Sequence, residues 1–355
     1  MRFFNTSGPC VAGSHYMLPV AARLDYNKVS RRIGQSEYCL LYGPPQTGKT
    51  TALLDLARQL TAAGQYVAAL LSLQAGGGLR DEVERAEQAI LADWRPAAQQ
   101  QLPADLQPPV WAGEVTGTRI SSALRAWAKA APRPLVVLLD DLDALQDRVL
   151  ISVLSQLRAA FADRPLNFPQ AMFFISTQSL RDYQVSPGIA HPVTFFNIIT
   201  ESWALRNFSL PDVAALYRQH TDATGQAFSE AAVQRAYELT EGQPQLVNAL
   251  AKIAVEELSA DRSLTITSET IGFAQARLIE QRSGRLDWLM QWLREPRVRQ
   301  VLALQRAGNA PYEMALEDLT LAKTLGLLQT PQQGGLFTAN PIYAEIVRRE
   351  LAVVN

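Results

Sequence analysis

The segment that most constrains the fold of this chain is residues 43–50, which read Gly-Pro-Pro-Gln-Thr-Gly-Lys-Thr. The segment fits the pattern G-x-x-x-x-G-K-S/T, with an apolar run at 38–42 before it and apolar residues at helical spacing from 51 to 63 after it. Its glycines let successive backbone N–H groups point at phosphate oxygens, and the following helix adds its positive N-terminal end. A glycine-rich turn without a ligand is the alternative, but the correct flanks favour a phosphate-binding loop.

We expect this loop to bind a nucleoside triphosphate, most simply ATP with Mg²⁺. Lys49 is expected to reach the β- and γ-phosphates, and the Thr50 hydroxyl is expected to ligate Mg²⁺. The predicted nucleotide-binding residues of the loop are Gly43, Pro44, Pro45, Gln46, Thr47, Gly48, Lys49, Thr50 and Thr51.

A second motif ends the most strand-like run of the chain, at 135–139, with Asp140 and Asp141. In open α/β sheets the carboxyl ends of the strands are where ligands bind. We therefore expect Asp140 to be the carboxylate on the Mg²⁺ side, acting through water, and Asp141 to polarise the attacking water. The same acidic cluster, 140–143, could instead cap the following helix.

The first 200 residues alternate apolar runs with helical patterns, which predicts an α/β fold with a parallel sheet. Strands are expected at 38–42, 66–73, 135–139 and 171–175, with a short fifth strand at 204–208. One complete strand thus lies between the two motifs, an order that fits P-loop ATPases rather than small-molecule kinases. The fourth strand ends in polar residues, so Gln178 or Arg181 could sense the γ-phosphate; a plain polar loop is equally compatible.

The second half of the chain is predicted to be helical. Amphipathic helices are expected at 211–224, 229–240 and 244–258, and further helices up to 328. A terminal β-hairpin, 327–330 with 336–339, then indicates a winged-helix unit. The predicted domains are an N-terminal arm and helix covering the nucleotide at 1–34, a P-loop core at 35–209, a helical lid at 210–262 and a winged helix at 263–355.

Composition excludes several classes of protein. The net charge is −1, so no global positive field attracts nucleic acid or anionic membranes. Two cysteines and three widely separated histidines offer no zinc-ligand spacing. The N-terminus does not read as a signal peptide, and no run approaches the ~18 apolar residues of a membrane span. A cytoplasmic protein without a membrane partner is expected.

Taken together, the chain resembles the AAA+/STAND group of prokaryotic ATPases, and more narrowly a bacterial "AAA-like ATPase" family. Besides the two motifs, the stretches that carry the resemblance are Phe3-Phe4-Asn5-Thr6, Gly8-Pro9, His15-Tyr16, Arg181-Asp182-Tyr183, Glu241-Gly242-Gln243-Pro244 and Ala339-Asn340-Pro341-Ile342-Tyr343. The resemblance implies a five-stranded core in the order 5-1-4-3-2, a helical lid and a winged helix. It also implies that Pro244 lies near the base and sugar, and that residues 15–24 cover the adenine ring.

The chain departs from the family pattern at three places. Asp141 stands where a glutamate is usual, and a carboxylate misplaced by ~1 Å can lower the rate on the order of 10²-fold. Ser176-Thr177-Gln178-Ser179 replaces Gly-x-Arg-Asp, which removes a cation unless Arg181 substitutes. Pro45 stands where arginine is common. These departures concern turnover more than binding.

Two functions fit these observations. The first is a nucleotide-gated switch or scaffold that hydrolyses ATP slowly. The second is a DNA-acting, initiator-like ATPase that uses the winged helix and the six arginines between 277 and 299, although such arginines also suit a solvated helix face. A protein partner could instead bind the winged helix. Because family members often continue into a nuclease-like domain, an effector domain beyond this chain is a further possible partner.

Overall fold

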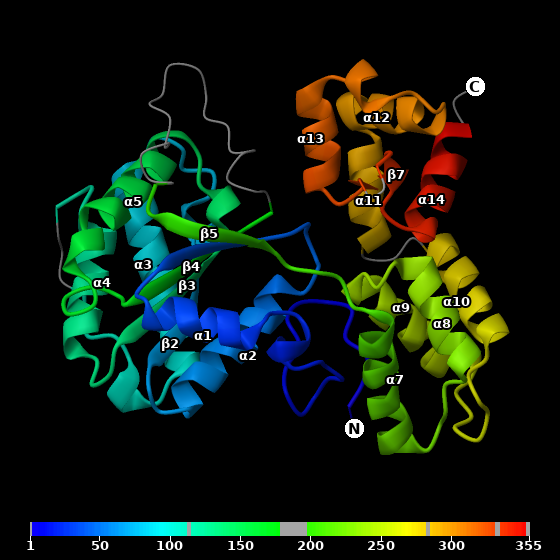
Figure 1. Cartoon of the computed structure of the whole chain (residues 1–355), viewed down its shortest axis with the longest axis horizontal. Coiled ribbons are helices and arrows are strands. Elements are labelled where there is room, and N and C mark those ends of the chain that lie inside the picture. The colour runs from blue at the N-terminus through cyan, green and yellow to red at the C-terminus, as the bar shows by residue number, and fades with distance from the viewer. Residues whose placement is uncertain (1, 112–114, 178–196, 282–284, 331–333, 353–355) are drawn as a thin grey trace. The chain divides into compact units, whose positions relative to one another are not determined.

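The computed structural model of the chain describes residues 2–111, 115–177, 197–281, 285–330 and 334–352 (Figure 1). The chain divides into two compact units. The first comprises Met1–Arg23, Pro44–Thr51 and Arg206–Asn355, and the second comprises Leu24–Gly43 and Ala52–Leu205. Each unit is described by itself below.

The second unit is built on a five-stranded parallel sheet. Its strands are β1 (Tyr38–Tyr42), β2 (Val67–Ser72), β3 (Leu135–Asp140), β4 (Ala171–Ser176) and β5 (Ile199–Ala204). They lie in the order β2-β3-β4-β1-β5, and every neighbouring pair is parallel. This is the predicted order 5-1-4-3-2 read from the other edge, so the predicted α/β P-loop core is confirmed.

The fifth strand begins and ends earlier than the sequence predicts. The expected range was 204–208, whereas β5 is Ile199–Ala204, with side chains alternately half-buried and exposed. An edge strand of this kind contains polar residues and lacks the continuous apolar run by which the inner strands were recognised. Glu201 of β5 forms ion pairs with Lys28 and, at 2.8 Å, with Arg32 on helix α1 (Tyr26–Gly34).

Replacing Glu201 by glutamine is expected to change how stability depends on pH. The hydrogen bond from Lys28, helped by Trp203 and Arg32, holds the pKa of Glu201 at about 2, against an ordinary value of 4.5. A carboxyl with a lowered folded pKa stabilises the protein above its unfolded pKa, and this contribution is lost as the pH falls through about 2. Urea unfolding from pH 6 to pH 2 should show wild type and Glu201→Gln converging towards acid.

The exposed Glu280 on α10 (Ser268–Gln281) provides the control substitution, Glu280→Gln. A wild-type advantage over Glu201→Gln that stays constant down to pH 2 would contradict the assigned ion pairs.

Helices cover both faces of the sheet. Helices α3 (Val83–Gln101), α4 (Arg119–Ala130) and α5 (Asp147–Ala159) pack on one face, and Figure 1 shows α1 and α2 (Lys49–Ala62) over the other. The side chains of Trp94 and Trp127 are fully buried in the core under α3 to α5.

Helix α3 extends to Gln101, into a stretch rich in Gln and Pro. The reason is tertiary: the Gln101 amide donates to the Leu70 carbonyl at 2.7 Å and accepts from the Leu70 N–H at 2.9 Å. The helix thereby covers the free edge of β2. Helix α4 was not assigned from the sequence.

The first unit contains the C-terminal half of the chain. Its main elements are α7 (Leu210–Thr224), α8 (Glu230–Thr240), α9 (Pro244–Ile253, prolonged by a π-helical turn at Ala254–Leu258), α10, α11 (Arg285–Leu293), α12 (Pro296–Arg306), α13 (Leu316–Thr324), β6 (Leu328–Gln329), β7 (Phe337–Thr338) and α14 (Pro341–Ala352). The expected hairpin is present as the antiparallel pair β6–β7.

The hairpin is not terminal, however, because α14 follows it. Helix α10 packs against α8 and α9. The winged-helix assignment and the domain boundaries given above stay predictions. Among the described helices, none combines the length and apolar character needed to cross a lipid bilayer.

The N-terminal arm also belongs to the first unit. Phe4 and Tyr16 are each 1% exposed, and their rings lie 4.8 Å apart. Phe4 also contacts the rings of Tyr217 and His220 on α7, at 5.7 and 5.5 Å between centroids. This aromatic cluster fixes the arm against α7.

Candidate functional site

The predicted phosphate loop connects the end of β1 to the start of α2. Gly43 donates its N–H to the Ser176 carbonyl at the end of β4, at 3.2 Å, and α2 begins at Lys49. Lys49 Nζ and Thr47 Oγ1 both donate to the Pro44 carbonyl, each at 2.9 Å. The loop is therefore closed on itself, with the Lys49 ammonium group held over it.

Two residues of the loop have left-handed backbone. Gln46 has φ 63° and Gly48 has φ 76°. A Cβ atom on Gly48 would lie 3.3 Å from Arg23 Nη1 and 4.0 Å from Pro244 Cβ. The glycine predicted from the motif is therefore required both by its backbone conformation and by close neighbours.

Side chains from the N-terminal arm and from the N-cap of α9 hold carbonyl groups of the loop. Arg23 Nη2 donates to the Thr47 carbonyl at 2.7 Å, and Gln243 Nε2 donates to the Gln46 carbonyl at 3.3 Å. Arg23 and Gln243 are each only 7% exposed. Burial lowers the pKa of Arg23 to about 10, with a smaller lowering from Arg206, so its guanidinium stays charged at neutral pH.

Neither residue was assigned this role from the sequence. For Gln243 the sequence contains one local signal. This residue precedes Pro244, the first residue of α9, and is therefore an N-cap candidate. For Arg23 the sequence contains no such signal, because its hydrogen-bond partners lie far away in sequence.

Two other predicted nucleotide-binding residues have assigned positions. Pro244 is buried beside Gly48, at the start of α9. Thr51 Oγ1 accepts the N–H of Cys10 at 3.0 Å, which ties the N-terminal arm to the helix after the loop. Their contacts with nucleotide stay predictions.

The acidic motif lies in the second unit, at the carboxyl edge of the sheet. Asp140 is the last residue of β3 and is 6% exposed; its Oδ1 accepts the Asp141 N–H at 2.9 Å. Asp141 has φ 59°, and its Oδ2 accepts the hydroxyl of Ser72, at the end of β2, at 2.7 Å. The left-handed turn at Asp141 thus directs its carboxylate towards β2.

A third carboxylate at this edge was considered only as part of a possible helix cap. Asp143 Oδ1 accepts the Ser176 hydroxyl at 2.5 Å, and its Oδ2 accepts the Thr177 N–H. Asp143 therefore connects the residues after β3 to the end of β4. Gln178 and Arg181, predicted to sense the γ-phosphate, lie outside the described residues.

The topology of the second unit brings Gly43 and Asp140 to one edge of the sheet. Because β1, β3 and β4 are parallel, their carboxyl ends meet at the same side of the sheet, where Gly43 and Asp140 both lie. Gly43 is also the first residue of the phosphate loop.

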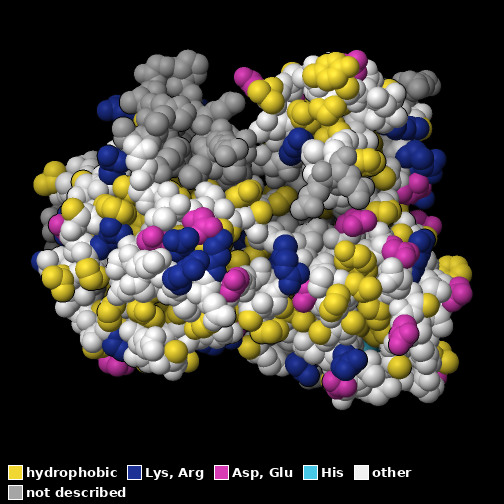
Figure 2. All heavy atoms as spheres, viewed as in Figure 1, with side chains coloured by type: hydrophobic (Ala, Val, Ile, Leu, Met, Phe, Trp, Pro, Cys, Tyr) yellow, Lys and Arg dark blue, Asp and Glu magenta, His cyan; other side chains and the backbone are white. Residues whose placement is uncertain are grey.

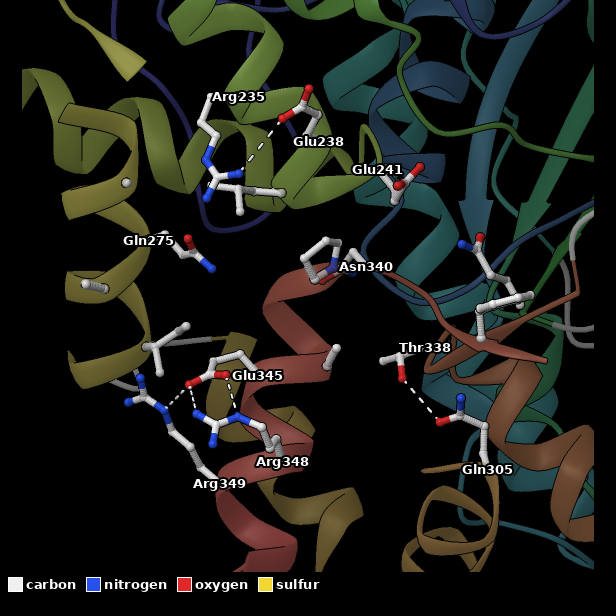
Figure 3. Close-up of a pocket in the computed structure, with 18 residues that line it drawn as sticks. Arg235, Glu238, Glu241, Gln275, Gln305, Thr338, Asn340, Glu345, Arg348 and Arg349 are labelled. Carbon is white, nitrogen blue, oxygen red and sulfur yellow. Dashed lines mark hydrogen bonds and ion pairs between the residues drawn. The ribbon is translucent and has the colours of Figure 1, made fainter. Parts of the chain in front are cut away.

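A hollow of about 870 Å³ lies among α8, α10, α14 and β7 in the first unit (Figure 3). Five of its six charged side chains pair with one another: Glu345 binds Arg348 and Arg349, each at 2.7 Å, and Arg235 lies 3.9 Å from Glu238. None of the predicted site residues that the structure describes lines this hollow, and its mixed charges favour neither an anionic nor a cationic ligand.

Comparisons with known proteins agree with this architecture. Residues 24–168 match the family model described as AAA ATPase domain. The whole chain is similar in structure to a Walker-type ATPase of Pyrococcus abyssi (TM-score 0.62, 13% identity, covering 97% of this chain and 99% of that one). It is also similar to the ORC2 protein of Aeropyrum pernix, solved in ADPNP–ADP complexes (TM-score 0.52, 12% identity, 92% of each chain). No curated protein matches by sequence.

The fold, the loop and the family match together define the class. The described sheet and loop form an α/β P-loop core, and residues 24–168 match an AAA ATPase domain. At these low identities the structural neighbours establish the fold alone.

Proposed function

We propose that this protein binds ATP with Mg²⁺ at the phosphate loop and acts as a nucleotide-gated switch or scaffold with slow hydrolysis. The observation that carries the proposal is the loop itself, closed between β1 and α2 with Lys49 held over it by a 2.9 Å bond to Pro44. Lys49 can exchange that neutral carbonyl for phosphate oxygens, and charge-assisted hydrogen bonds are about twice as strong as neutral ones.

The donor set suits a triphosphate. Backbone N–H groups of the loop and the N-terminus of α2 attract phosphate oxygens, and Lys49 adds a full positive charge. The Thr50 hydroxyl is the proposed Mg²⁺ ligand on the loop side, and Asp140 the carboxylate on the strand side. A bound Mg²⁺ would neutralise developing charge on the phosphates.

Slow hydrolysis is proposed on the basis of Asp141. One oxygen of this carboxylate accepts the Ser72 hydroxyl, and the side chain is one methylene shorter than the glutamate usual in the family. A shorter carboxylate that is directed towards β2 is poorly suited to polarise a water next to the γ-phosphate, because general-base catalysis requires hydrogen-bond reach.

The test is to measure phosphate release and ATP affinity on the same preparations of wild type and Asp141→Ala. We expect micromolar binding in both, and turnover well below the ~10 per second typical of enzymes. Asp141→Glu serves as the matched variant and should raise turnover. Wild-type turnover of several per second that Asp141→Ala abolishes would contradict the slow-switch proposal.

The alternative is a DNA-acting ATPase that uses the C-terminal helices. Within the arginine-rich stretch 277–299, which would contact DNA, Arg277 lies 3.4 Å from Glu257, and Arg297 lies 2.5 Å from Asp318. Figure 2 shows basic and acidic side chains interspersed on the face it presents. Ion-paired arginines on a mixed surface favour a solvated helix face, and a protein partner for these helices fits the near-neutral charge better.

Duplex-DNA titration at 50 and 200 mM salt separates the two functions. We expect no salt-dependent binding. A loss of affinity that is steep in salt would establish phosphate contacts and favour the DNA-acting alternative.

A further inference from the structure

We propose that Arg23 and Gln243 are positioning residues that orient the phosphate-binding N–H groups of the loop, so that phosphate affinity depends on the arm and the lid. This inference rests on the proposed nucleotide-binding function and names the residues that regulate the same site.

The geometry of the peptide bond links each loop carbonyl to the N–H group of the next residue. A trans peptide is planar, so the carbonyl of one residue and the N–H of the next point in opposite directions. Gln243 holds the Gln46 carbonyl and thereby fixes the direction of the Thr47 N–H. Arg23 holds the Thr47 carbonyl and thereby fixes the direction of the Gly48 N–H. Both N–H groups belong to the part of the loop that is expected to surround phosphate.

Fixing these directions has a large effect on binding. Glycine at position 48 permits rotation that other residues resist, and Gln46 and Gly48 both have left-handed φ values. If no side chain held the two carbonyls, the bound phosphate would itself have to fix the orientation of both peptide planes. Donors that order them in advance remove that cost from the binding free energy.

Arg23 connects the loop to the segment that leads into the lid. Its Nε donates to the Arg206 carbonyl at 2.8 Å, and its guanidinium lies 5.0 Å from the centre of the Phe208 ring. Arg206 in turn binds Asp212 in the first turn of α7, at 2.6 Å. One buried cation therefore contacts the loop carbonyl and the segment before α7 at the same time.

Gln243 connects the loop to α9 in the same way. Its Oε1 accepts the Leu246 N–H at 2.7 Å and caps α9, while its Nε2 donates to the loop. The Gln243 amide can therefore form both hydrogen bonds only when α9 and the loop lie next to each other. By linkage, phosphate bound in the loop then favours the docked lid to the same extent as the docked lid favours phosphate.

The test compares two variants with a matched control. Gln243→Glu keeps an acceptor for the Leu246 N–H, which preserves the cap, but loses the donor to Gln46. Gln219→Glu is the control, because Gln219 binds both backbone groups of Met17, at 2.8 and 3.3 Å, and so joins arm and lid away from the loop. Arg23→Met removes both of its hydrogen bonds, and Arg23→Lys restores the charge with part of the hydrogen bonding.

Calorimetric titration of each full-length variant with adenosine, AMP, ADP and ATP gives the readout. We expect Gln243→Glu and Arg23→Met to lose affinity for ADP and ATP about 10-fold, the effect of one hydrogen bond, with a clearly smaller loss for adenosine. Arg23→Lys should recover part of the loss, and Gln219→Glu should match wild type. Should Arg23→Met fail to fold, the capped Gln243→Glu variant still decides the question.

Equal losses for adenosine and ADP, or losses in Gln219→Glu as large as in Gln243→Glu, would overturn the inference while leaving nucleotide binding intact. Failure of wild type to bind ADP or ATP would instead overturn the proposed function, and the inference with it.

Discussion

The Lys49→Ala variant is expected to bind ATP about 10- to 100-fold more weakly than wild type, since a hydrogen bond to a charged group contributes about 1.5–3 kcal/mol. Lys49 begins α2 and its ammonium group already lies over the loop, bonded to the Pro44 carbonyl. Alanine removes the charge without burying anything new, and it favours the helix. Calorimetric titration with ATP in the presence of Mg²⁺ measures the loss.

The matched control is Lys129→Ala, which removes an exposed lysine near the end of α4. It should bind ATP as wild type does, with an unchanged melting temperature in both variants. Wild-type affinity in Lys49→Ala would show that the phosphates bind elsewhere.

The second large effect is expected from Gly242→Ala, at the start of the lid motif Gly242-Gln243-Pro244. Gly242 has φ 66°, and a Cβ atom there would lie 1.8 Å from the Phe208 carbonyl oxygen. Its own carbonyl accepts the Phe208 N–H at 2.8 Å, so the two backbones cannot separate without losing that bond. Left-handed strain of about 1–2 kcal/mol and overpacking of about 1–3 kcal/mol predict a loss of roughly 4 kcal/mol in unfolding free energy.

Gly225→Ala is the matched control for this substitution. Gly225 ends α7 with φ 79°, and no atom lies within 4 Å of the Cβ that alanine would add. The two variants share the left-handed strain and the effect of alanine on the unfolded chain, so their difference isolates the close approach to Phe208. Urea unfolding should show Gly225→Ala losing only about 1–2 kcal/mol. Equal losses would mean that the segment before α7 can move away from the lid motif.

The core of the fold could be predicted because its signals are local. The inner strands β1, β3 and β4 are continuous apolar runs, buried on both faces, and each ends in residues of distinct chemistry. Elements without such runs were misplaced or missed. Strand β5 is half polar because it lies at an edge, and α14 follows a hairpin that looked like the end of the fold.

The candidate site was predictable to the same extent. The residues of the phosphate loop and the strand aspartates follow from motifs of a few residues, and the structure places Gly43 and Asp140 at one edge of the sheet. Arg23 and Gln243 could not be found in that way. Gln243 acts on Gln46 across 197 positions, and no pattern within a short window reports such a contact.

The polar contacts at the sheet edge were missed for a related reason. Asp141 and Asp143 accept the hydroxyls of Ser72 and Ser176 on neighbouring strands, contacts that the sequence did not predict. The catalytic role of Asp141 stays a prediction. The resemblance implied which strands are neighbours, but the direction of each side chain depends on local backbone, such as the left-handed φ of 59° at Asp141.

The most direct test of nucleotide binding at this loop is a structure of the protein with a non-hydrolysable ATP analogue and Mg²⁺. We predict a β-phosphate enclosed by the backbone N–H groups of residues 45–49, with Lys49 Nζ on phosphate oxygen instead of the Pro44 carbonyl. Arg23 and Gln243 should still hold the Thr47 and Gln46 carbonyls. Nucleotide binding at this loop would be contradicted by an analogue bound elsewhere. It would also be contradicted if Lys49 stayed bonded to the Pro44 carbonyl at saturating analogue.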